Sequence, residues 1–159
     1  MGVPNGPFDI ELITRTKQLL DTYKGYYTNT LLMNSLLSLI VLPQQYNARQ
    51  RNLSFMNQDL TKIREIDFVL NSPRFLFDPR RHNNDLKNLM NRIRNGIAHQ
   101  NIQVIGKNHE WATIIIEDKD KSGQVGLHLE LTIEELKKLA IYIADEYTAA
   151  VQPPTSPVT

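Results

Sequence analysis

Residues 86–99 read LKNLMNRIRNGIAH, and this stretch has the clearest periodicity in the chain. Its apolar residues recur at intervals of three and four positions, which is the period of a helix with one buried face. These apolar residues are Leu86, Leu89, Met90, Ile93 and Ile97. We predict a helix that is capped by Asn83 or Asn84. Arg94 then lies beside the buried stripe, and His99 lies where the helix should end.

Other segments of the chain also have helical patterns. Residues 9–24 predict a first helix, and residues 27–42 predict a central one that is apolar almost all round and ends at Pro43. A third helix is expected over residues 57–70, with Leu60, Ile63, Ile66 and Leu70 as its inner stripe. The sequence Thr132-Ile133-Glu134-Glu135 is a capping box and predicts the start of a final helix.

Between these helices the pattern changes to that of β-strands. Residues 102–105, 111–117 and 125–131 are β-like, and a turn at residues 119–123 joins the last two. We therefore predict a mainly α fold, an antiparallel helical bundle with a small antiparallel β-hairpin appended before the last helix. Residues 1–150 are expected to form one domain, and residues 151–159, which are rich in proline, a disordered tail.

Composition and charge limit the functions that are open to the chain. Its 159 residues include no cysteine, so thiolate metal sites and cysteine nucleophiles are excluded. No signal peptide or membrane span is visible, and we expect a cytoplasmic protein without a membrane partner. His82, His109 and His128 have no metal-ligand spacing, and no glycine-rich phosphate loop is present. No metal or cofactor is therefore expected.

Positive charge is concentrated around the helix of residues 86–99. The net charge is only +1, but the segment from residue 74 to residue 94 has six basic and two acidic residues. A polyanion would be attracted to this segment. The candidate contacts to nucleic acid are Arg80, Arg81, Lys87 and Arg92. A solvated helix face without a ligand remains the alternative interpretation.

Arg94 and His99 together suggest chemistry on a phosphodiester. Arginine binds phosphate through two parallel hydrogen bonds, and histidine exchanges protons near neutral pH. Five residues correspond to about 140° around an ideal helix, at roughly 100° per residue. The two side chains can therefore meet on one phosphate only if the last turn loosens or a second subunit supplies one of them. The simpler alternative is a surface cation and a histidine that interacts with the helix dipole.

The sequence Arg94-Asn95-Gly96-Ile97-Ala98-His99 resembles the signature of the HEPN superfamily. That signature is an arginine, four to six residues and a histidine, often with Asn or Asp directly after the arginine. Residues 30–37, followed by Pro43-Gln44, resemble a group of small stand-alone HEPN proteins of bacteria and their plasmids. The resemblance extends from about Phe8 to Tyr147.

The resemblance implies a metal-independent endoribonuclease, since many HEPN proteins cleave RNA as toxins or in defence against phage. It also implies a homodimer in which two motifs line one cleft. Arg94 would bind the scissile phosphate, His99 would act as general acid or base for attack by the ribose 2′-hydroxyl, and Asn95 would orient one of them. RNA would be the substrate, and an antitoxin protein would be a further partner.

Two alternatives to catalysis remain open at this point. The chain also resembles a non-catalytic HEPN module that binds RNA, a nucleotide or a protein, although the presence of Arg94, Asn95 and His99 together favours catalysis. It would also suit a structural dimerisation domain in which the motif is incidental.

Overall fold

The computed structural model describes residues 8–22, 34–35, 37–41, 53–72, 76–77 and 84–151. The predicted tail from residue 152 onwards lies outside these residues, and so do Arg80, Arg81 and Asn83. Of the predicted helix 27–42, residues 34–35 and 37–41 are described, and they are helical.

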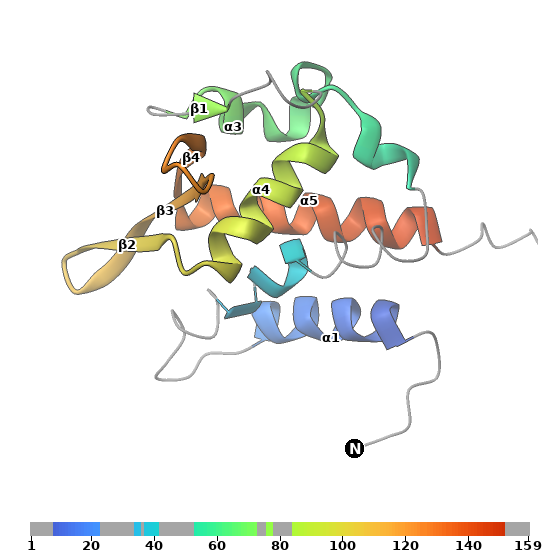
Figure 1. The fold of residues 1–159 in the computed structure, drawn as a ribbon. Helices are drawn as coiled ribbons and strands as arrows, with labels where there is room; N and C mark the ends of the chain where they lie inside the picture. The colour runs from blue at the N-terminus through green and yellow to red at the C-terminus, as the bar shows by residue number, and fades with distance from the viewer. Residues whose placement is uncertain are drawn as a thin grey trace, which may run out of the picture.

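Figure 1 shows the helices and strands that the chain forms, with α4 between the first strand of the sheet and the other three in sequence order. They are α1 (Phe8–Thr22), the 3₁₀ turns η1 (Ser54–Asn57), η2 (Leu60–Lys62) and η3 (Arg64–Ile66), α3 (Asp67–Leu70), β1 (Leu76–Phe77), α4 (Leu86–Ala98), β2 (Ile102–Lys107), β3 (Glu110–Lys119), β4 (Val125–Thr132) and α5 (Ile133–Val151). Within the described ranges, no helix is both long and apolar enough to cross a bilayer.

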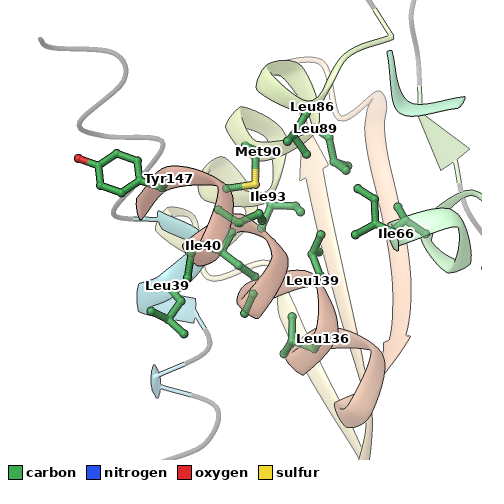
Figure 2. Packing of buried hydrophobic residues seen from close by; sticks show 14 of the residues in the cluster. Leu39, Ile40, Ile66, Leu86, Leu89, Met90, Ile93, Leu136, Leu139 and Tyr147 are labelled. Atoms are coloured by element: carbon green, nitrogen blue, oxygen red, sulfur yellow. The ribbon is translucent and has the colours of Figure 1, made fainter. Parts of the chain in front are cut away.

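Helix α4 forms where its periodicity predicts it. Leu86, Leu89, Met90 and Ile93 are fully buried, and Figure 2 shows them in one core with residues of α5 and of the segment around Ile40. The N-cap is Asp85, whose side chain accepts a hydrogen bond of 2.8 Å from the backbone N–H of Asn88. The predicted caps, Asn83 and Asn84, were therefore wrong by one or two positions.

The sheet corrects the predicted fold class. It has four antiparallel strands in the order β1-β4-β3-β2, so the prediction of a small hairpin appended to a helical bundle is wrong. One face of the sheet is buried and consists of Ile114, Ile116, Leu127, Leu129 and Leu131. Helices α4 and α5 pack on this face. The sheet is thus a layer of the core, because its buried aliphatic face must be covered.

The segment before α3 also differs from its prediction. Residues 57–70 form the turns η2 and η3 and the four-residue helix α3, not one long helix. Leu60, Ile63, Ile66 and Val69 are buried at a constant interval of three residues. That interval matches the 3.0 residues per turn of a 3₁₀ helix, not the 3.6 of an α-helix.

The last helix begins as its capping box predicts. Thr132 accepts a hydrogen bond of 3.1 Å from the N–H of Glu135, and the Glu135 carboxylate accepts one of 2.9 Å from the N–H of Thr132. Strand β4 ends at Thr132 and α5 begins at Ile133, so the cap itself is the connection between them. Helix α1 contacts α5, and an ion pair joins Lys17 to Asp145.

Gly96 permits the closest contact between α4 and the sheet. A Cβ atom at this position would lie 2.6 Å from the carbonyl oxygen of Glu117 and 2.8 Å from Cγ2 of Ile116. Both distances are shorter than van der Waals contact, and one of the atoms belongs to the backbone of β3. Glycine is therefore required for α4 to lie this close to β3.

We predict that Gly96→Ala lowers the free energy of unfolding by about 2 kcal/mol, because the methyl group overpacks the contact with β3. Helix propensity acts in the opposite direction, since alanine is favoured over glycine by about 1 kcal/mol in a helix. The sign of the change in a denaturant titration therefore separates the two effects. Ala98→Gly, at an exposed position of the same helix, provides the propensity scale. An increase in stability on Gly96→Ala would contradict the packing argument.

Candidate functional site

Helix α4 stays regular up to Ala98 and then closes with a Schellman motif. The N–H of Asn101 donates to the carbonyl of Gly96 at 2.8 Å, and the N–H of Gln100 donates to that of Ile97 at 3.1 Å. Gln100 takes the left-handed conformation that this motif needs, with φ of 58°. His99 is exposed at the C-cap. Before Ala98 the helix therefore does not loosen.

The Arg94 side chain is half-buried on α4. Its Nη2 donates a hydrogen bond of 2.9 Å to Oδ1 of Asn91, one turn earlier. Its Nε is buried and has no hydrogen-bond partner among the described residues. A buried donor without an acceptor destabilises a protein by roughly 1–3 kcal/mol, and such donors are rare in native structures. Nε of Arg94 is therefore a candidate for binding a ligand.

Two other predicted site residues meet at a carboxylate on the sheet. Oδ2 of Asp118, on β3, accepts hydrogen bonds from Nη1 of Arg92 at 2.8 Å and from Nδ2 of Asn95 at 3.4 Å. The side chains of Asp118 and Arg92 are 4% and 15% exposed. The structure thus brings Arg92 and Asn95 together through Asp118, whereas the predicted partners of Asn95 were Arg94 or His99.

Of the remaining candidate contacts to nucleic acid, Lys87 is the one that the structure describes. Lys87 is exposed in the first turn of α4, whereas Arg92 is in the second turn and is paired with Asp118. Arg80 and Arg81 lie outside the described residues. Among the described candidates for contact with nucleic acid, Lys87 is therefore the one with an exposed side chain.

Asp118 is the functional-site residue that the sequence analysis missed. The strand predicted from the sequence ends at Glu117, one residue before Asp118. Ile114, Ile116 and Asp118 are two residues apart, which puts all three on the buried face of β3. An acidic residue that continues an alternating buried pattern, opposite a helix with two arginines, was the signal available.

A second charged cluster lies on the other face of the sheet. Glu117 contacts Lys119 at 3.1 Å between Oε2 and Nζ, and His128 at 3.2 Å between Oε1 and Nδ1. The hydrogen bond from Lys119 lowers the pKa of the Glu117 carboxyl below its ordinary value, against the opposing effect of burial. Glu117 is therefore ionised at neutral pH. Nε2 of His128 is buried without a partner among the described residues.

No group of three or more histidine, aspartate or glutamate side chains within the described ranges is arranged to hold a metal ion. The side chains at the end of α4 include the guanidinium of Arg94, the imidazole of His99 and the amide of Asn95. Such groups bind phosphate and transfer protons.

One protein-family model matches this sequence over nearly its whole length. The family described as HEPN pEK499 p136 matches residues 1–153. The chain belongs to this HEPN family. Its Arg94-Asn95 and His99 thus lie in a HEPN protein at the end of α4, and membership points to a function that involves nucleotides or RNA. Searches of curated proteins and of solved structures gave no significant match.

We predict that Asp118→Asn destabilises this HEPN protein by about 3 kcal/mol, because it leaves the Arg92 guanidinium largely buried without its counter-ion. Thermal or denaturant unfolding measures the change. Glu11→Gln is the matched control, since it removes the carboxylate of an exposed ion pair with Arg15 and should change the free energy of unfolding by less than about 1 kcal/mol. Equal effects of the two substitutions would show that the Asp118 pair contributes no more than a surface pair.

Proposed function

We propose that the protein is a metal-independent endoribonuclease of HEPN type, in which Arg94 and His99 act at an interface between two subunits. The observation that carries the proposal is the buried Nε of Arg94, which has no hydrogen-bond partner among the described residues. This arginine is the one that the HEPN-like motif places at the site. A phosphate oxygen would supply the missing acceptor, and a guanidinium holds phosphate through two hydrogen bonds at once. A small adjustment of the half-buried side chain would be needed for the phosphate to reach it.

The proposed reaction needs only proton transfer and charge stabilisation. The ribose 2′-oxygen attacks phosphorus while a base takes its proton, and the bond from phosphorus to the 5′-oxygen breaks as an acid protonates that oxygen. The products are a 2′,3′-cyclic phosphate and a 5′-hydroxyl. Histidine is suited to both proton transfers, and Arg94 would stabilise the charge that develops on the phosphoryl oxygens. His99 is exposed at the helix end, where it is accessible to RNA.

The regular geometry of α4 supports a site that two subunits share. Since the helix does not loosen before Ala98, Arg94 and His99 diverge by about 140° around its axis. One subunit then offers its arginine and histidine in different directions. Two subunits related by a two-fold axis can place the Arg94 of one against the His99 of the other.

Other residues of α4 would have supporting roles. Lys87 is exposed and is the described candidate for contact with the RNA backbone. Arg92 and Asn95, both bonded to Asp118, would hold α4 on the sheet and so fix the direction of Arg94. Arg80 and Arg81 would extend the phosphate contact from the preceding segment.

The proposed chemistry of this RNase needs neither metal nor cofactor, so withholding either one would not restrain it. In a cell such an activity is harmful unless a partner restrains it. This supports a role as a toxin or phage-defence effector, with a protein antitoxin as the restraining partner and the cytoplasm as the place of action.

We predict that the wild-type protein cleaves mixed cellular RNA in excess EDTA and leaves 2′,3′-cyclic phosphate ends, and that His99→Ala lowers the rate at least about 100-fold. A denaturing gel and end-group analysis measure this. His109→Asn is the control: it removes another exposed imidazole, and asparagine tolerates the left-handed backbone there, where φ is 66°. If neither wild type nor His99→Ala cleaves, or both cleave alike, the protein is better described as a non-catalytic binding module.

Mixing two inactive variants tests the shared site. In a heterodimer of Arg94→Ala and His99→Ala, one composite site retains both an arginine and a histidine, so we expect activity of up to half the wild-type level. Each variant alone should remain inactive. An inactive mixture, with subunit exchange demonstrated by native mass spectrometry, would assign both residues to one subunit.

A further inference from the structure

We propose that a polar hollow directly after His99 binds a nucleobase of the RNA, next to the scissile phosphate. The inference rests on the proposed function and extends it from phosphate chemistry to recognition of a base. It concerns residues that the Arg94/His99 motif does not include.

Residues of the connection from α4 to β2, and of β2 and β3, line the hollow. Figure 1 shows the path of the chain from α4 into β2, which is an edge strand of the sheet. Its volume is about 170 Å³, smaller than the roughly 300–1,000 Å³ of pockets for whole drug-sized ligands. It can therefore admit one small planar group but not a complete nucleotide. The lining residues that matter here are Gln100, Asn101, Gln103, Ile115, Glu117 and Lys119.

Backbone pairing fixes the walls of this hollow. Gln103 on β2 pairs with Ile115 on β3, and Glu117 lies two residues further along the same face of β3. Asn101 is tied at both ends, since its N–H donates to Gly96 and its carbonyl accepts from the N–H of Glu117 at 3.0 Å. The hollow is thus rigidly connected to the end of the helix that carries His99.

The Schellman motif explains the backbone conformation of Gln100 but not why the residue is a glutamine. Its φ of 58° is the left-handed conformation in which glycine is preferred, and a non-glycine residue there is strained. Strained positions of this kind cluster at functional sites. Gln100 is exposed and lines the hollow, so its side chain gains nothing from packing in a core. A role of its amide in binding would account for glutamine at this position.

The chemistry of the lining suits the edge of a base. Each glutamine amide provides donors and an acceptor. Glu117 and Lys119 are paired with each other at 3.1 Å, but a carboxylate has further lone pairs and an ammonium has further N–H donors for a base. RNA-binding proteins read unstacked bases through hydrogen bonds of this type. Ile115 supplies an apolar surface against which a ring can lie. Gln100 directly follows His99 in the chain, so a base held here belongs to a nucleotide at the cleavage point.

The experiment is an NMR titration of the full-length protein with AMP, GMP, CMP and UMP, each compared with ribose 5-phosphate, which lacks a base. We expect at least one nucleotide to bind about tenfold more tightly than ribose 5-phosphate and to shift the Gln100 and Gln103 resonances. Gln100→Gly and Gln103→Ala should each remove most of this preference. Gln18→Ala, at an exposed position on α1, is the matched control and should retain it.

Gln100→Gly also separates binding from folding. Relief of the left-handed strain should raise its melting temperature by roughly 2–4 °C while its affinity for the nucleotide falls. Equal affinity for nucleotides and ribose 5-phosphate, or wild-type binding by both glutamine variants, would overturn the proposal. If base binding persists but RNA is not cleaved in EDTA, the hollow stands and the RNase assignment fails. If RNA is cleaved without base binding, the reverse holds.

Discussion

The close approach of α4 to β3 is the constraint on which the other features depend. Gly96 brings the helix against the Glu117 carbonyl, and one residue further along β3 Asp118 binds Arg92 and Asn95 of the same helix. A steric contact and a buried ion pair thus act on successive residues of one strand. Together they fix the axial position and the rotation of α4, and hence the directions in which Arg94 and His99 leave it.

The sequence predicted those parts of the fold that local chemistry determines. The amphipathic stripe of α4 and the reciprocal cap at Thr132 and Glu135 depend on residues within a few positions of each other. The extent of the sheet depends on pairing across long stretches of sequence, and β1, with two residues, carries no periodic signal. The prediction of one helix over residues 57–70 is wrong, because the sequence analysis placed Leu70 rather than Val69 on the inner stripe, and the resulting spacing of three, three and four resembles an α-helical period.

In the candidate site too, the sequence predicts the features that depend on neighbouring residues but not those that depend on long-range contacts. Arg94, Asn95 and His99 stand close together in the sequence and were found from it, but the direction of each side chain depends on the sheet. Asn95 donates to Asp118, 23 residues away, and Arg92 is drawn into the same buried cluster. A cluster of positive charge in a sequence does not distinguish an arginine that binds a ligand from one that binds its own fold.

The junction between β4 and α5 has a consequence for how the length of this chain can change. Thr132 both ends the strand and caps the helix, so there is no loop between β4 and α5 that could accommodate an inserted residue. One added residue would rotate α5 by roughly 100° and turn its apolar stripe away from the sheet. The turn at Asp120–Gly123, which is exposed at Lys121, Ser122 and Gly123, carries no such coupling. Insertions, tags and fusion points therefore belong in that turn, and the strand-to-helix junction must keep its length.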